Sequence, residues 1–413
     1  MSEPLIPISY RQAILFACFL VFYEFLTYIA NDMIMPGMIS VVHSFNSPES
    51  MIATSLTLYV LGGASLQLIL GPISDTFGRR SSMLFGALLF FIFTLFIASS
   101  NSMNQFLLAR FFQGMGLCFI GVIGYATIQE IFAEMDAIRI IAVMANAAIL
   151  APLLGPLFGA LVIHYTSWRW IFIMIAVAAL IALWGLWMYM PEPIGQIKKD
   201  GEMIPKPSFS LKTALKNYKD LFTNLSFCSS AIALGIVIVP CMIWIALAPV
   251  ILIAQAKLTV MQYALWQLPI FSATILGNWV LHRLTYKYKI KTIVLIGTFI
   301  LTIGLILTAL LPYLFGSQYQ TLLPGIIIYF FTIGIITAPL NRFSLFVTSV
   351  TKGTASAIVS LSIMVIGAIG IEVGSALYHH NNLNFGLYCA AVGLLFLLFV
   401  AITFWSSKVE ITN

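Results

Sequence analysis

Residues 22–38 read FYEFLTYIANDMIMPGM, an apolar run of the kind that spans a membrane, yet it contains two carboxylates, Glu24 and Asp32. A charge at mid-bilayer costs about 2.5 to 3.5 kcal/mol on insertion scales, so such residues usually face a cavity or a partner. On a helix with about 100° per residue, Glu24, Tyr28 and Asn31 share one stripe. Asp32 lies beside that stripe. The pattern predicts a helix that lines a wet cavity; the alternative is that each acid is a structural group held by hydrogen bonds.

The composition excludes an ordinary soluble domain. The chain has 413 residues, of which 61% are hydrophobic and 8% are charged, whereas a soluble domain carries about 25% charged residues. The net charge of +6 does not indicate nucleic-acid binding, because that inference needs a clustered basic face. The five cysteines lie in apolar runs, the five histidines lack the spacing of metal ligands, and no Walker sequence occurs. We therefore expect a polytopic membrane protein with no metal and no cofactor.

Runs of about 20 apolar residues predict the membrane spans. Six are expected at 12–38, 50–72, 80–99, 104–130, 138–164 and 168–190, and six more at 222–253, 259–282, 291–313, 321–344, 354–379 and 384–406. Between them lies the one long polar segment, rich in lysine, proline and glycine. The predicted fold is all-α, with twelve transmembrane helices in two six-helix halves, 1–192 and 222–413, joined by a cytoplasmic linker, 193–221.

Lysine and arginine predict the orientation, because they gather on the cytoplasmic side of short loops. With the N-terminus cytoplasmic, that side holds Arg11, Arg79, Arg80, Arg139, Lys198, Lys199, Lys206, Lys212, Lys216, Lys219, Arg283, Lys287, Lys289, Lys291, Arg342, Lys352 and Lys408. The other side holds only Arg169 and Lys257. Both termini are therefore expected in the cytoplasm.

The loop GPISDTFGRR, residues 71–80, follows the second predicted span. Its glycines and proline permit a tight bend, and Asp75, Arg79 and Arg80 are able to form charge-assisted bonds. The loop resembles the signature loop of the major facilitator superfamily, in which such an acid and basic loop latch the cytoplasmic side. A plain positive anchor would account for the arginines but leave Asp75 unexplained.

Arg110 lies in LLARFFQGMG, several residues into the fourth predicted span. A buried guanidinium keeps its proton and must find acceptors. Asp32 is the expected counter-charge, and Gln113 lies one turn further, within reach of the same network. An intramembrane pair of this kind usually marks a substrate or ion path, and the alternative is a structural ion pair.

The fifth predicted span contains ANAAILAPLLGPLFGA, residues 145–160, which gathers Pro152, Gly155, Pro156 and Gly159. Glycines let a neighbouring backbone approach, and prolines remove helical hydrogen bonds, so this segment is expected to bend and to pack closely. It resembles the antiporter signature of the superfamily's drug exporters. That resemblance implies exchange of substrate against an ion.

Taken together, several stretches resemble the multidrug/proton antiporters of the major facilitator superfamily. They are YEFLTYIANDMIMPGM (23–38), GPISDTFGRR (71–80), ARFFQGMGLCFIGVIGYATIQE (109–130), ILAPLLGP (149–156), WQLPIFSATILGN (266–278) and KGTASA (352–357). The resemblance implies proton and substrate carboxylates at Glu24 and Asp32, a buried arginine at Arg110 and a latch acid at Asp75. It further implies a drug pocket lined by Tyr28, Asn31, Met144 and Ala148, and functional polar positions at Gln267 and Arg342.

The expected function is proton-coupled export of lipophilic cationic and neutral drugs by a monomer with alternating access. A proton and a cationic drug would compete for one carboxylate. One alternative is a proton-coupled importer of a defined metabolite, and another is a membrane enzyme or sensor that does not transport. The sequence leaves the role of Glu372 open; it is a third carboxylate within an apolar run.

Overall fold

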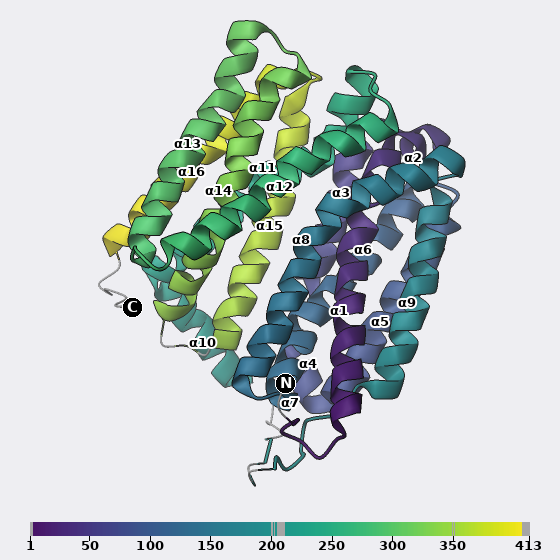
Figure 1. Ribbon diagram of the computed structural model, residues 1–413, viewed down its shortest axis with the longest axis vertical. Coiled ribbons are helices and arrows are strands. Elements are labelled where there is room, and N and C mark those ends of the chain that lie inside the picture. Colours follow the sequence, from purple (N-terminus) through teal and green to yellow (C-terminus); the bar gives the residue numbers. More distant parts are fainter. Residues whose placement is uncertain are drawn as a thin grey trace. The chain divides into compact units, whose positions relative to one another are not determined.

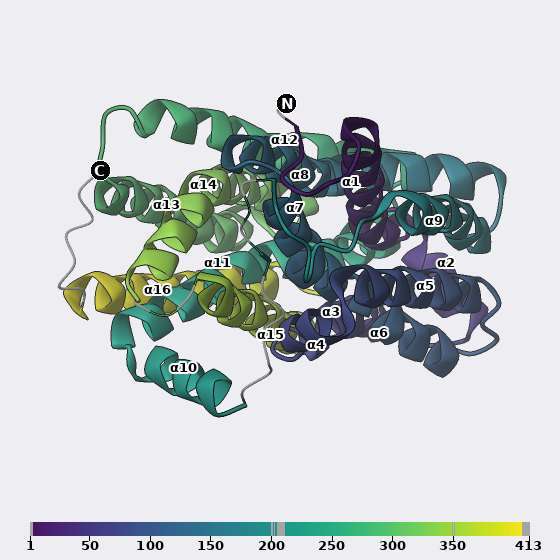
Figure 2. The same ribbon diagram turned by 90° about the horizontal axis from the view of Figure 1, so that it is seen from below.

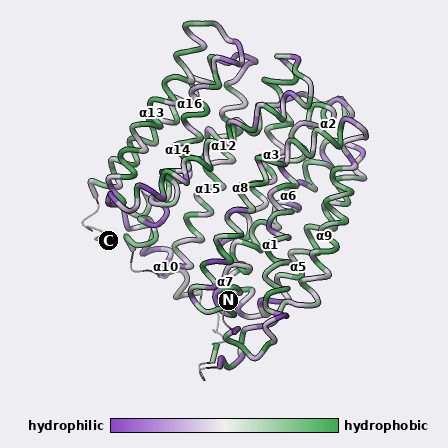
Figure 3. The backbone as a smooth tube through the Cα atoms, in the orientation of Figure 1, coloured by the Kyte–Doolittle hydropathy of each residue, from purple (hydrophilic) through white to green (hydrophobic). Residues whose placement is uncertain are grey.

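The computed structural model describes residues 3–199, 201, 203–204, 211–348, 350 and 352–406, with the backbone alone at 211–215. Lys206 and Lys408, two of the predicted cytoplasmic charges, lie outside these residues, as does the side chain of Lys212. The described chain is almost entirely helical, and hydrophobic residues run along the helices while hydrophilic ones gather at their ends (Figure 3). Among the described residues, eleven helices are long and apolar enough to cross a membrane, or twelve if one bent pair counts as a single span. The predicted all-α polytopic fold is confirmed.

The chain divides into two compact units. Unit 1 consists of Met1–Gly37 and Leu58–Leu211, and unit 2 of Met38–Thr57 and Lys212–Asn413. The short segment 38–57 packs with the second unit although the chain on either side of it belongs to the first. Each unit is described by itself below.

Unit 1 contains most of the helices drawn from purple to blue in Figure 1. They are α1 (Tyr10–Asp32), α4 (Leu70–Phe77), α5 (Arg79–Ala98), α6 (Met103–Phe119), α7 (Tyr125–Ile131), α8 (Glu134–Tyr165) and α9 (Arg169–Tyr189), and the end of α3 (Ser50–Ser65) joins them. Helix α1 packs against α8 and α9, and α5 packs against α6 and α9. The hydroxyls of Ser9 and Ser102 cap α1 and α6 by accepting backbone N–H bonds.

The prediction of one unbroken helix over 50–72 is wrong. Helix α3 ends at Ser65, α4 begins at Leu70, and the two are bent by 50°. The Ser65 hydroxyl donates to the Gly62 carbonyl, and the Gln67 amide donates to the Gly63 carbonyl. Side chains that bond to nearby carbonyls compete with the helical ladder, so hydropathy alone does not locate this break.

Two other predicted spans among the first six are interrupted. The first ends as a helix at Asp32 and continues as a 3₁₀ turn, Met35–Gly37, and α2 (Met38–Ser44). The residue before a proline avoids helical geometry, so Pro36 explains the change. In the fourth span a π-helical turn, Ile120–Gly124, separates α6 from α7. Such turns insert one extra residue and occur often at functional sites.

Unit 2 contains α2, the start of α3 and the helices that follow α9, whose colours run to the yellow end of the scale in Figure 2. They are α10 (Leu211–Thr223), α11 (Leu225–Ala248), a π turn (Pro249–Gln255), α12 (Val260–Leu284), α13 (Ile290–Phe315), α14 (Tyr319–Phe346), α15 (Lys352–Tyr378) and α16 (Asn382–Ser406). Helix α11 packs against α14, α15 and α16, and α13 packs against α14. Helix α10 lies where only a polar linker was predicted, because its short LKTALKNYKDLFT sequence is amphipathic and not continuously apolar.

The N-terminal segment is fastened to the start of the linker within unit 1. Leu5 donates its N–H to the carbonyl of Ile131 and accepts a bond from the N–H of Lys199, both at 2.8 Å. The Lys199 ammonium also lies 2.6 Å from a carboxylate oxygen of Glu3. Residues 3–9 are therefore held as a strap beside the end of α7.

Candidate functional site

The polar stripe of α1 is buried in unit 1. Glu24, Asn31 and Asp32 expose 1%, 7% and 6% of their surface, and Tyr28 is half-buried. The acids thus lie inside packed protein, as charged groups in a membrane segment must unless they face water. Their partners decide what they are able to do.

Arg110 links α1 to two further helices. It is fully buried and donates from Nη2 to Asn31 Oδ1 at 2.5 Å and from Nη1 to Gln113 Oε1 at 2.8 Å. The Gln113 amide in turn donates a hydrogen bond to the Thr94 hydroxyl of α5 at 2.9 Å. The place of Gln113 in this network agrees with the sequence expectation.

Asn31 stands between the arginine and the acid. While its Oδ1 accepts from Arg110, its Nδ2 donates to Asp32 Oδ1 at 3.2 Å. The sequence suggested a direct counter-charge pair, and the structure shows an amide relay between the two charges. The Arg110 guanidinium also lies over the Tyr59 ring, 4.4 Å from its centre, which favours a desolvated cation.

Glu24 has a partner that the sequence did not reveal. The Tyr125 hydroxyl donates to Glu24 Oε1 at 2.9 Å. The other oxygen, Oε2, is buried and has no hydrogen-bond partner among the described residues. A regular helix would turn Tyr125 about 120° from Gln113, and the one-residue shift of the π turn reduces this to about 20°. The turn thereby puts Tyr125 on the network face, and hydropathy gave no signal of it.

The glycines of α8 bring its backbone against the acidic end of α1. A Cβ built on Gly155 would lie 2.8 Å from Asp32 Cβ, and one on Gly159 would lie 1.9 Å from the Met33 carbonyl oxygen. Both approaches are closer than any side chain allows. The other members of this predicted segment, Pro152 and Pro156, lie inside the same helix.

The two pocket residues implied on α8 lie toward its N-terminal part. Met144 is fully buried and Ala148 is half-buried. They are four residues apart and so share a face of the helix with Pro152. Met144 and Ala148 therefore belong to the same helix that approaches Asp32 closely through its glycines.

The loop after α4 forms a charged cluster inside unit 1. Arg79 lies 2.6 Å from Asp75 and 2.8 Å from Glu130, and it donates to the Ser74 hydroxyl at 2.5 Å. Asp75 therefore has the arginine partner expected of it. Glu130 is 51 residues away in sequence, and sequence reasoning missed it.

Glu192 closes the same loop from the end of α9. Its carboxylate accepts the backbone N–H groups of Arg79 and Arg80 at 3.0 Å each. Gly78 has φ +97°, and a Cβ there would lie 2.4 Å from Glu192 Oε2. Only glycine satisfies both the backbone angle and the space. The Arg80 guanidinium turns away to the Trp187 carbonyl, at 2.5 Å.

The polar residues singled out in unit 2 are the neutral Gln267, the exposed Arg342 and the half-buried Glu372. Gln267 is buried, accepts from Trp244 Nε1 at 3.0 Å and leaves Nε2 without a partner among the described residues. Arg342 is exposed and its guanidinium lies 4.6 Å from the centre of the Phe346 ring. Glu372 is half-buried, with Oε1 unpartnered in the described part of the chain. No cluster of three potential metal ligands occurs in the part of the chain that the structure describes.

Curated relatives resemble the chain along nearly its full length. It is 42% identical over 388 residues to the multidrug transporter MdfA of Yersinia pestis, with 94% of this chain and 93% of that protein covered. It is equally identical over 393 residues to MdfA of Escherichia coli O157:H7, with 95% and 94% covered. For MdfA of Edwardsiella piscicida the identity is 42% over 400 residues, with 97% and 96% covered.

Solved structures of transporters share the fold. A bacterial homologue of the lysosomal transporter Spinster superposes with a TM-score of 0.72 at 13% identity, with 97% of this chain and 98% of that chain covered. A D-xylose–proton symporter gives 0.71 at 17% identity, with 95% and 98% covered. Residues 20–371 match the family model of the Major Facilitator Superfamily. The chain therefore belongs to the Major Facilitator Superfamily of membrane transporters and is not an enzyme.

Proposed function

We propose that this transporter exports lipophilic cationic and neutral drugs in exchange for protons. The observation that carries the proposal is the pair of buried acids on α1, of which Glu24 keeps one oxygen unpartnered among the described residues while Asp32 is tied to Arg110 through Asn31. Full-length similarity to proteins named multidrug transporters supports drugs as the substrate class.

Glu24 is proposed to be the acid that binds a proton and a cationic drug in turn. Its Oε2 has no donor among the described residues, so it is satisfied by a proton or by an approaching cation. The Tyr125 hydroxyl fixes the other oxygen and thereby orients the carboxyl group. A proton and a cationic drug compete for this one position, and that competition produces exchange.

Asp32 is coupled to a different partner. The Asn31 amide connects it to the permanently charged Arg110, so a change in charge at Asp32 alters a chain that reaches α6 and α5. Burial of charged groups without water makes such a chain sensitive to each member. Asp32 is therefore proposed to link protonation to the packing of helices in unit 1.

Proton release from purified protein tests the proposal. Drug addition to the detergent-purified transporter should release protons, and Glu24→Gln and Asp32→Asn should each reduce that release. Glu24→Gln should impair export of lipophilic cations more than that of neutral drugs, since a neutral drug needs no counter-charge. Glu134→Gln, at an exposed acid of α8, is the matched control. Wild-type release and export by both variants would remove these acids from the mechanism.

The charged cluster around Arg79 is proposed as the conformational latch. Asp75→Asn removes a charge-assisted contact worth about 1.5 to 3 kcal/mol, which changes a two-state ratio roughly ten- to a hundredfold. The population of the inward-facing state should rise, the transport turnover should fall and drug binding should persist. Distances between spin labels on cytoplasmic loops of the two units report this. Distances that Asp75→Asn leaves unchanged, with and without drug, would make the loop an anchor only.

The chain is proposed to lie in the inner membrane as a monomer with both termini in the cytoplasm. The distribution of lysine and arginine supports this orientation. A reporter enzyme active only outside the cytoplasm should be silent when fused after residue 413, and active when fused into the loop near 316. The reverse pattern would invert the orientation.

A further inference from the structure

Helix α11 has a tyrosine hydroxyl at one rung of its backbone ladder. The Tyr329 side chain of α14 accepts the N–H of Cys241 at 3.1 Å and donates its own proton to the carbonyl of Val237 at 2.5 Å. A regular α-helix pairs these same two backbone groups, i and i−4, directly with each other. The hydroxyl is therefore a bonding alternative for both members of one rung.

The neighbouring rung lacks its donor. Pro240 lies inside α11 and has no N–H to donate to the carbonyl of Ile236. Prolines and groups inserted into the ladder are recognised causes of helix bending. At one turn of this membrane-spanning helix, one rung thus lacks its donor and the next has a hydroxyl bonded to both of its backbone groups.

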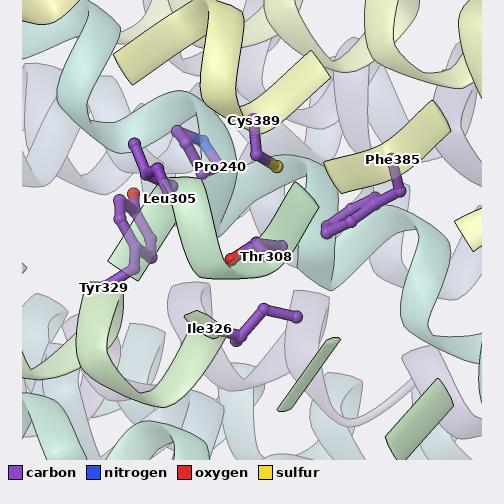
Figure 4. A pocket seen from close by; sticks show the side chains of 7 residues that line it. All are labelled: Pro240, Leu305, Thr308, Ile326, Tyr329, Phe385 and Cys389. Atoms are coloured by element: carbon purple, nitrogen blue, oxygen red, sulfur yellow. The ribbon is translucent and has the colours of Figure 1, made fainter. Parts of the chain in front are cut away.

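Side chains around this turn exclude water. Pro240, Leu305, Thr308, Ile326, Tyr329, Phe385 and Cys389 pack around this turn and leave no space among them that would hold a water molecule (Figure 4). An unpaired backbone group in such surroundings is costly. No water is able to enter here. The Tyr329 hydroxyl therefore keeps both Cys241 N–H and Val237 C=O hydrogen-bonded when these two backbone groups separate from each other.

Tyr329 is held firmly in place. Its side chain exposes 1% of its surface, and α14 lies so close to α13 that a Cβ on Gly304 would lie 3.1 Å from the Tyr329 backbone nitrogen. The hydroxyl end of the ring points toward the turn of α11 that carries Pro240 (Figure 4). The contact therefore connects the backbone of α11 to a rigid pair of helices.

We propose that Pro240 and Tyr329 form a hinge in α11. The missing donor at Pro240 loosens the turn, and the hydroxyl takes over both groups of the next rung, so the helix opens and closes there without an unpaired backbone group. The hinge lies wholly in unit 2 and uses no residue assigned to proton or drug binding.

Two substitutions test the hinge from opposite directions. Tyr329→Phe keeps the ring and removes the bridge, so the open rung loses both bonds. Pro240→Ala restores an N–H and adds a helical bond. Both are expected to keep α11 closed, although the first removes a hydrogen bond and the second adds one. Tyr388→Phe is the matched control, because it deletes a hydroxyl bonded at 2.7 Å to the Gly370 carbonyl in the same unit.

Spin labels measure the motion without any substrate. Labels at Leu225, at the start of α11, and Leu295, on α13, are both at exposed positions, in a background with the native cysteines replaced by alanine. Two distance populations are expected for the parent and for Tyr388→Phe, and one for Tyr329→Phe and Pro240→Ala. A single population in the parent, or distributions that both hinge variants leave unchanged, would overturn the proposal. The result does not depend on the proposed drug export.

Discussion

The two units bury polar groups of different kinds. In unit 1, Glu24, Asp32 and Arg110 are charged types whose partners are side chains from other helices or neighbouring positions. In unit 2, Tyr329 is neutral and bonds to the backbone of α11, and Gln267 bonds to the Trp244 indole. A side-chain network of charges responds to protons and ions, whereas a hydroxyl on a backbone rung responds to helix geometry. We therefore expect the proton chemistry to reside in unit 1 and the bending of a helix backbone to occur in unit 2.

The largest effect is expected from Arg110→Ala. Removing one member of a buried charged network costs about 3 to 5 kcal/mol, because the remaining groups stay buried without their partner. Asn31 and Gln113 both lose a donor. Arg110→Lys should also be poorly tolerated, since lysine lacks the planar fork. Thermal unfolding in detergent checks this, with Arg283→Ala as control at an exposed arginine beside Trp279. Equal stability of the Arg110→Ala and Arg283→Ala proteins would contradict the prediction.

Glycine-to-alanine changes should separate packing from chemistry. A Cβ would lie 1.9 Å from a backbone oxygen at Gly159 in unit 1 and at Gly277 in unit 2, and such overpacking costs about 1 to 3 kcal/mol. Both variants should lose similar stability. Only Gly159→Ala, which displaces α8 from the end of α1 that carries Asp32, should also reduce drug-induced proton release.

The control for this pair is Gly353→Ala, because no atom lies within 4 Å of a Cβ built there. It should unfold like the parent protein. A loss of proton release by Gly277→Ala as large as that by Gly159→Ala would remove the distinction between the units.

Tyr125→Phe should have a smaller effect on stability and a clear one on coupling. One hydrogen bond contributes about 0.5 to 1.5 kcal/mol net, and the variant keeps the ring. Glu24 then loses the donor that orients it, so drug-induced proton release should fall. Tyr388→Phe removes a hydroxyl bound to a backbone carbonyl and should leave that release unchanged. Similar release from both variants would contradict the proposed role of Tyr125.

The smallest effect is expected at the exposed Glu3–Lys199 pair. Lys199 donates a hydrogen bond to Glu3 and attracts its charge, which holds the pKa of that carboxyl below its usual 4.5. A lowered folded-state pKa stabilises the fold fully above pH 4.5, and the contribution disappears as the pH falls through the folded value. Glu3→Gln should remove this dependence, and salt should weaken it. If Glu3→Gln lost more thermal stability at neutral pH than Gly159→Ala, the expected order of effects would be wrong.

The sequence was most informative where a single physical quantity decides the structure. Continuous apolar length fixed the spans, so most of them agree with the structure to within a few residues. The break after Ser65 depends on side chains that bond to helical carbonyls, and α10 depends on an amphipathic pattern too short and polar for a span. Neither feature changes hydropathy enough to be noticed.

The candidate site was only partly predictable for a different reason. Isolated charges in apolar runs identified Glu24, Asp32 and Arg110, because burial of charge is rare. Their surroundings include Tyr125, which is 101 residues from Glu24, and the loop cluster includes Glu192, which is 113 residues from Arg79. Such pairs are set by helix packing and by one π turn. A single sequence contains no direct record of either.

The strap at residues 3–9 makes the first unit depend on the order of synthesis. The bond between Lys199 and Glu3 spans 196 residues. The hydrogen bond from the Lys199 N–H to the Leu5 carbonyl likewise forms only after Lys199 has been synthesised. At about 5 to 20 residues per second, a ribosome needs roughly 10 to 40 s to reach it. During that time Leu5 is able to pair with Ile131 at the end of α7, once that helix emerges, but not yet with Lys199. Docking of the strap is thus a late event in biogenesis, completed when nearly half of the chain has been translated.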